Sequence, residues 1–245
     1  EQGEEVYTDG EINNHLDYDI DGRIIHALSA KVKFAKNAAV QNDGLLGFGL
    51  PGYESALKKV EESDTVYDRR GNIVEKVVDE WLVPGNSILK LVEGEGFNVP
   101  TIDLTVKDGS GNLLCQKILG HKTVNESFNF KGQPLTTTVY NYKWTKSGVR
   151  DVKSYYNGTT TDKRYDISGT VLLKSIEGSF LLSQDLLASE STDLLVKEYD
   201  SLKVSVFETY DSAYENATLT TVDNYDLLEA TDDYASIADE NKQTH

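Results

Sequence analysis

The sequence predicts a mainly β protein in which antiparallel strands form a β-sandwich of the immunoglobulin-like or jelly-roll type. Two observations predict it. From about residue 99 to residue 222, short apolar or alternating segments follow one another, and clusters of Asp, Asn and Gly separate them. Alternation of apolar and polar residues is typical of strands that bury one face, and such short strands at close spacing are typical of sandwiches and barrels.

The turn residues predict where the strands of this region begin and end. Gly and Asn reach positive φ cheaply, so they favour the tight turns of hairpins. Residues 108–112 (Asp-Gly-Ser-Gly-Asn) predict a hairpin between 101–107 and 113–119. Further expected strands, separated by Asn157-Gly158 and by residues 176–179, are 149–156, 164–173, 180–182, 201–208 and 217–222.

One region shows a different period. Between residues 72 and 83 the apolar residues occur in adjacent pairs that are separated by polar pairs, a spacing that fits a helix better than a strand. Asn72 would cap this helix with Glu75, and Pro84 would end it. A second helix is expected at 53–62, so one or two short helices are predicted between residues 53 and 83.

The length of the chain, 245 residues, is enough for one main hydrophobic core. We therefore expect an N-terminal arm or edge strand at 1–20, a β-sandwich domain with a helical insertion at 21–228, and an acidic C-terminal tail at 229–245. The sequence contains no apolar segment long enough to span a membrane. It begins at Glu1 and contains no Met, which we interpret as a processed, extracellular or cell-surface protein.

The chain is strongly acidic, and the acidic residues are unevenly distributed. The formal net charge is −17. Residues 185–245 contain 15 acidic and 3 basic residues, a net charge of −12. Because binding to nucleic acids and to anionic membranes depends on Lys and Arg, this composition predicts that nucleic acid is not a partner.

Three Asn-x-Ser/Thr sequons permit glycosylation, at Asn125, Asn157 and Asn216. Asn157 is expected at a turn tip and the other two in polar connections, where a glycan would fit. The single cysteine, Cys115, excludes an intrachain disulfide, and its place in an alternating segment predicts a buried thiol.

A candidate Ca²⁺ site lies near the N-terminus. Asp17, Asp19 and Asp21 alternate before Gly22 and resemble the first positions of an EF-hand calcium loop, whose hard oxygen ligands bind Ca²⁺. Position twelve is Leu28, where that loop has a bidentate Glu. The same alternation fits a strand that enters an Asp-Gly hairpin, which is the interpretation we favour, with Ca²⁺ as the alternative.

A row of aromatic residues is the candidate ligand or assembly surface. Tyr140, Tyr142 and Trp144 would share one face of a strand, where they would stack on sugar rings or on a partner protein. The same pattern is also typical of a core face.

The sequence contains no motif of a known catalytic centre, and its four histidines lack metal-ligand spacing, so a non-enzymatic function is expected. The favoured prediction is a structural subunit of an extracellular, self-assembling filament, pilus or surface layer, a homopolymer joined by strand addition through residues 4–20. The alternatives are an adhesive or carbohydrate-binding β-sandwich module that uses Ca²⁺ and binds glycans, and a virion structural protein.

Overall fold

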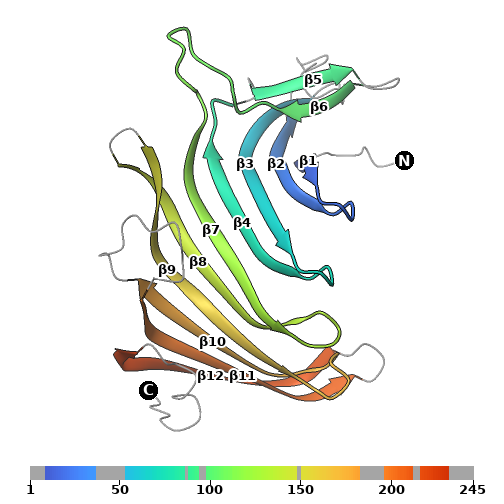
Figure 1. Ribbon diagram of the computed structural model, residues 1–245, viewed down its shortest axis with the longest axis vertical. Coiled ribbons are helices and arrows are strands. Elements are labelled where there is room, and N and C mark those ends of the chain that lie inside the picture. The colour runs from blue at the N-terminus through green and yellow to red at the C-terminus, as the bar shows by residue number, and fades with distance from the viewer. Residues whose placement is uncertain are drawn as a thin grey trace. The chain divides into compact units, whose positions relative to one another are not determined.

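The computed structural model describes residues 9–36, 53–85, 88–93, 98–147, 150–182, 196–211 and 216–231 (Figure 1). Within these residues the chain is built almost entirely of strands. They are β1 (Asp9–Tyr18), β2 (Ile24–Lys36), β3 (Tyr53–Tyr67), β4 (Ile73–Leu82), β5 (Leu89–Glu93), β6 (Asn98–Ile102), β7 (Gln116–Phe128), β8 (Pro134–Ser147), β9 (Arg150–Tyr165), β10 (Leu172–Leu182), β11 (Lys197–Asp211) and β12 (Asn216–Thr231).

Ten of these strands form one antiparallel sheet in the order β1-β2-β3-β4-β7-β8-β9-β10-β11-β12, and β5 pairs with β6 in a second, small sheet. Neighbours in the large sheet follow the order of the chain, so it is a meander of hairpins that only β5 and β6 interrupt. The predicted fold class, mainly β and antiparallel, is confirmed, and a large sheet with a small second sheet is consistent with a sandwich-like fold.

The two predicted helices are wrong: residues 53–62 lie in β3, and residues 73–82 form β4. In β4 the adjacent residues Val78 and Asp79 are both buried, so the paired apolar spacing comes from a strand that buries side chains on both faces. Four residues of this segment, Ile73, Val74, Val77 and Val78, are β-branched, which favours a strand over a helix. In the described residues no helix has the length and hydropathy needed to cross a bilayer.

The predicted turns had mixed outcomes. A tight turn at 108–112 is present, although only a single bridge, between Lys107 and Leu113, flanks it. The predicted turn at Asn157-Gly158 is wrong because these residues lie inside β9, and residues 176–179 likewise lie inside β10. A Cβ atom at Gly158 would lie 2.4 Å from Cζ of Phe180. The glycine therefore makes room for an aromatic ring on the neighbouring strand.

One turn type recurs at five positions, 19–23, 68–72, 108–112, 129–133 and 166–170. Each turn begins with Asp or Asn and has Gly in the fourth place. In each, the glycine N–H donates to the first residue's carbonyl at 3.0 to 3.1 Å. The glycine has φ between 69° and 88°, a conformation that only glycine adopts without strain. Four of these turns are the hairpin connections β1–β2, β3–β4, β7–β8 and β9–β10.

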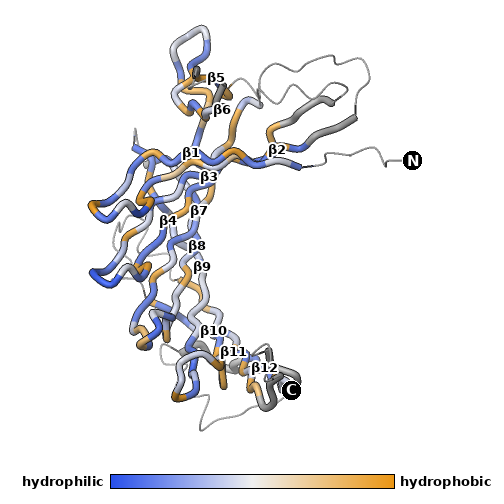
Figure 2. Tube along the Cα trace, turned by 90° about the vertical axis from the view of Figure 1, so that its right-hand side faces the viewer, coloured by the Kyte–Doolittle hydropathy of each residue, from blue (hydrophilic) through white to orange (hydrophobic). Residues whose placement is uncertain are grey.

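The chain forms two compact units: unit 1 contains Glu1–Asp64 and Val78–Leu119, and unit 2 contains Thr65–Val77 and Gly120–His245. Figure 2 shows hydrophobic and hydrophilic residues alternating along many of the strands, as the exposed and buried faces of a sheet require. Residues 9–18 of the expected arm form β1, an end strand of the sheet, and residues 19 and 20 begin the turn to β2. Residues 229–231 of the expected tail belong to β12, and residues 232–245 lie outside the described part.

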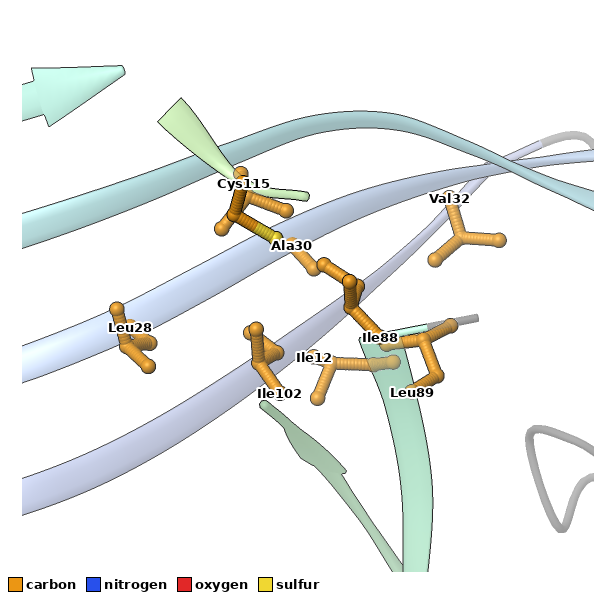
Figure 3. Close-up of a cluster of buried hydrophobic side chains, with 9 residues drawn as sticks. Ile12, Leu28, Ala30, Val32, Ile88, Leu89, Ile102 and Cys115 are labelled. Carbon is orange, nitrogen blue, oxygen red and sulfur yellow. The ribbon is translucent and has the colours of Figure 1, made fainter. Parts of the chain in front are cut away.

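The core of unit 1 lies between the large sheet and the small one (Figure 3). Ile88, Leu89 and Ile102 of the small sheet's segment pack against apolar residues of β1, β2 and β3. The buried set is Ile12, Leu28, Ala30, Val32, Val60, Ile88, Leu89, Ile102 and Cys115. Asn14 fixes the contact, since its Nδ2 donates to the carbonyl of Pro100 (3.1 Å) and its Oδ1 accepts from the N–H of Ile102 (2.8 Å).

Unit 2 has its own core, built from aromatic and aliphatic side chains on one face of β8, β10 and β11. Its buried residues are Tyr140, Phe180, Leu182, Tyr199, Leu202 and Val204. Hydrogen bonds between polar side chains join neighbouring strands elsewhere in this unit, for example Thr137 Oγ1 to Asn125 Oδ1 (2.8 Å) and Asn141 Nδ2 to Asn157 Oδ1 (3.0 Å). The alternation in sequence thus corresponds to an apolar and a polar face.

Candidate functional site

The three N-terminal carboxylates lie at the β1–β2 hairpin, which confirms the hairpin interpretation of this segment. Asp19 Oδ1 accepts from the N–H groups of Asp21 (3.0 Å) and Arg23 (2.9 Å), and its Oδ2 accepts from Arg23 Nε (2.6 Å). Asp21 Oδ2 accepts from Arg23 Nη2 at 2.8 Å, whereas Asp17 Oδ1 accepts from the N–H of Tyr18. The carboxylates of Asp19 and Asp21 therefore both bind the guanidinium of Arg23.

This arrangement explains the electrostatics of the turn. Desolvation acts to raise the pKa of Asp19, but the hydrogen bonds and the charge of Arg23 outweigh it and hold the pKa below its usual value. In the described part of the chain, no three His, Cys, Asp or Glu side chains gather closely enough to hold a metal ion. Binding of Ca²⁺ by Asp17, Asp19 and Asp21 stays a prediction.

The aromatic row lies on one side of β8, but most of it is not a surface. Tyr142 has no exposed area and Tyr140 is buried, whereas Trp144 is half-buried. The Tyr142 ring packs edge-on against Trp144 and Tyr155, with centroids 6.2 and 5.1 Å away. Lys153 Nζ lies 4.7 Å from the centroid of Tyr142. Tyr140 and Tyr142 are therefore packing residues, and Trp144, with Lys153 of β9 beside it, is the member of the row that reaches solvent.

The sequons lie in strands. Asn125, in β7, donates from Nδ2 to the carbonyl of Ile73 at 2.9 Å and accepts at Oδ1 from Thr137. Asn157 lies in β9 and accepts from Asn141, so its expected place at a turn tip is wrong. Asn216 is the first residue of β12, so the expected place of Asn125 and Asn216 in polar connections is also wrong. A glycan at Asn125 or Asn157 would replace hydrogen bonds that join strands.

Unit 1 contains a charged cluster that the sequence did not reveal. Lys117 Nζ, in β7, lies 2.7 Å from Asp79 Oδ2 in β4 and 2.8 Å from Glu62 Oε2 in β3. Glu62 Oε1 in turn lies 3.0 Å from His26 Nε2 in β2. The four groups come from four strands, so no motif spacing could have brought them to notice.

The chemistry of this cluster is that of an ion-pair network. Desolvation acts to lower the pKa of Lys117. The hydrogen bonds to Asp79 and Glu62 and their negative charges raise it by a larger amount, so the pKa is above its usual value. A lysine that stays protonated is neither a nucleophile nor a general base. The ring of Trp81, whose centroid is 5.2 Å from Lys117 Nζ, adds a cation–π contact. The cluster thus neutralises Asp79, which is almost completely buried.

The end strand β1 offers a different kind of site. A shallow hollow of about 520 Å³ lies over the three strands at this end of the sheet and is lined by residues of β1, β2 and β3: Asp9, Gly10, Glu11, Lys31, Val32 and Lys58. Beyond β1 the sheet has no further strand in the described part of the chain, and the same holds beyond β12.

Comparison of the chain with protein-family models, with curated proteins and with solved structures finds no match.

Proposed function

We propose that this protein is a non-enzymatic structural subunit that associates with further copies of itself by adding strands at the open edges of its ten-stranded sheet. The observation that supports the proposal is the strand order, in which β1 and β12 each have one neighbour. An end strand presents unpaired N–H and C=O groups, which another strand can satisfy.

The topology permits a head-to-tail arrangement. The sheet has an even number of antiparallel strands, so β1 and β12 run in opposite directions. If β1 of one copy pairs with β12 of the next, the alternation of strand direction continues without a break. Such a contact joins two different surfaces, so it leads to an open polymer, or to a ring where the rotation between copies closes, and not to a two-fold dimer.

The proposal modifies the expected mechanism of strand addition. Residues 9–18 of the expected arm pair with β2 of their own chain, from Asp9 opposite Lys33 to Tyr18 opposite Ile24. Ile12 is buried in the core, so removing β1 from its own sheet would expose that core. We therefore propose that the edges of two complete sheets dock, with β1 in place.

Electrostatics oppose this docking at low ionic strength. The end strand β1 contains Asp9, Glu11 and Asp17, and β12 contains Asp223, Asp226 and Glu229. Like charges on paired strands are destabilising. Because salt shortens the screening length from about 10 Å at 0.1 M to about 3 Å at 1 M, it should promote association.

The test is sedimentation velocity of the purified chain over a wide range of concentrations, at low and at high salt, with electron microscopy of the high-salt samples. We expect oligomers that grow with concentration and are favoured by salt. A chain that remains a monomer under all of these conditions would exclude the proposed function.

A further inference from the structure

Three turns of unit 2 lie side by side: 68–72, 129–133 and 166–170. A Cβ atom at Gly132 would lie 2.4 Å from Asn72 Oδ1, so the first turn touches the second. The second touches the third, because Asn129 Nδ2 donates to the carbonyl of Gly169 at 3.0 Å and the ring of Phe130 lies over Gly169. Residues at the second and third positions of these turns therefore form one surface.

That surface exposes large apolar side chains. Phe130 is 71% exposed and Ile167 is fully exposed, and both occupy the second position of their turns. Figure 2 shows hydrophobic segments in several of the hairpin turns. Single exposed apolar residues are common on soluble proteins, but two that protrude from adjacent turns form an apolar patch that favours contact with another apolar phase.

The same surface carries unneutralised positive charge. Arg69, Arg70 and Lys131 are exposed and form no ion pair with any residue that the structure describes. The two carboxylates of these turns point inward instead: Asp68 accepts from the N–H groups of Arg70 (2.8 Å) and Asn72 (2.9 Å). Asp166 likewise accepts from backbone N–H groups of its own turn.

We define Arg69, Arg70, Phe130, Lys131 and Ile167 as the turn-tip patch. With Asp68 and Asp166 included, the three turns have a formal charge of +1 in a chain whose net charge is −17. Charges elsewhere on the chain are screened beyond about 10 Å at 0.1 M salt. The local charge, rather than the net charge, therefore determines what this surface attracts.

We propose that the turn-tip patch docks on the surface of an anionic lipid bilayer. Phe130 and Ile167 enter the interfacial region, and the three cations face the anionic headgroups. Protruding apolar side chains flanked by cations suit this occupant, because a bilayer surface accepts both burial of apolar area and positive charge. The protein lies on the membrane and does not span it.

The test is co-sedimentation of the full chain with phosphatidylcholine vesicles that do or do not contain phosphatidylserine. We expect binding only to the anionic vesicles. The triple variant Arg69→Gln, Arg70→Gln, Lys131→Gln should bind roughly a hundredfold more weakly, since each cation near such a surface contributes about fivefold. The variant Phe130→Ser, Ile167→Ser should lose at least about tenfold.

Matched controls separate the patch from general effects. Lys143→Gln with Lys203→Gln removes two exposed cations of the same unit, and Leu181→Ser removes an apolar side chain of β10 that is 52% exposed. Neither should change binding. Phe130→Trp gives a direct readout, because emission of an inserted indole shifts to the blue when anionic vesicles are added. Circular dichroism and thermal unfolding establish that each variant is folded.

Several outcomes would overturn the inference. One is a wild-type chain that does not bind phosphatidylserine vesicles, and another is binding that the turn-tip variants leave unchanged. If the patch cations are required for binding to polyglutamate while vesicles are not bound, the surface recognises an acidic polypeptide and not a membrane.

Discussion

Lys117 is the residue whose removal should have the largest electrostatic effect. It neutralises Asp79, which is only 2% exposed, and it also pairs with Glu62. In Lys117→Met the carboxylate of Asp79 would stay buried without its ammonium partner. Breaking a buried pair in this way costs about 3 kcal/mol. We expect this loss in the free energy of unfolding by urea at pH 7.

A double variant distinguishes this cause from lost packing. Asp79→Asn, Lys117→Met removes the buried charge together with its partner, so it should recover much of the stability that Lys117→Met loses at pH 7. A double variant that is as unstable as Lys117→Met would show that the lysine contributes through its methylene groups.

Gly158 is a residue where packing permits no side chain. A Cβ atom there would lie 2.1 Å from the carbonyl oxygen of Val139 and 2.4 Å from Phe180 Cζ. Because one of these atoms is backbone, Gly158→Ala should lower the free energy of unfolding by about 1 to 3 kcal/mol. The control is Gly109→Ala, where a Cβ atom would meet nothing within 4 Å and the change should stay within about 0.5 kcal/mol. Equal effects of the two substitutions would contradict the packing argument.

At the scale of elements, the recurring turn depends on the oxygen atoms of its first residue. Asp166 Oδ2 accepts from Ser168 Oγ (2.6 Å), and Oδ1 accepts from the N–H of Val171 (3.0 Å). These bonds, that of Ser168 first, lower the pKa of Asp166. A lowered pKa means that the stabilisation is complete above the ordinary value, near 3.8, and is lost as the pH falls through the folded-state value.

Two substitutions at this position test the turn. The turn at 129–133 has Asn129 in the place equivalent to Asp166. The Oδ1 atom of Asn129 accepts corresponding hydrogen bonds from the backbone, for example from the N–H of Lys131 at 2.9 Å. Asp166→Asn should therefore keep the Tm near the wild-type value at pH 7, whereas Asp166→Ala should lower it by a few degrees. Between pH 5 and pH 3 the wild type should lose more stability than Asp166→Asn, which does not titrate there. Equal Tm values for the Ala and Asn variants at pH 7 would mean that the side chain does not support the turn.

The same elements show what could be predicted from the sequence. The turn at 108–112 and the hairpin at Asp19 were predictable, because a tight turn needs residues that local sequence reveals. Asn157-Gly158 has the same local signal, yet its glycine accommodates Phe180, a contact across strands. The helix predicted from the apolar spacing of residues 73–82 was wrong for a related reason. The segment is a strand that buries side chains on both faces, and Asp79 can be buried there because Lys117 of another strand pairs with it.

The candidate sites depended even more on such contacts. The alternation of Tyr140 and Tyr142 correctly placed them on one face, but whether that face is exposed depends on neighbouring strands. The charged cluster and the turn-tip patch each bring together residues from three or more distant segments, which become neighbours only through the strand order. The net charge also concealed the local positive charge of Arg69, Arg70 and Lys131.

At the scale of the whole molecule, the acidic edges both protect the sheet and make the proposed association testable. Charged residues on an end strand are a common defence against uncontrolled pairing. Asp9 and Glu11 are exposed on β1 and share one face, while the opposite end of the sheet presents exposed Asp223 and Asp226. Reversal of charge on one edge should therefore convert repulsion into attraction between β1 and β12 of successive copies.

The variant Asp9→Lys, Glu11→Lys should associate at low salt, where the wild type should remain mostly monomeric, and added salt should weaken its association. This reversal of the salt dependence is specific to an edge-to-edge contact, because only there do the two charged strands face each other. Glu177→Lys with Glu198→Lys makes the same change of charge at exposed positions of β10 and β11, interior strands of the sheet, and should leave the salt dependence unchanged. Sedimentation velocity of the three proteins at two salt concentrations provides the comparison. If both variants respond to salt alike, net charge controls association and the edges do not.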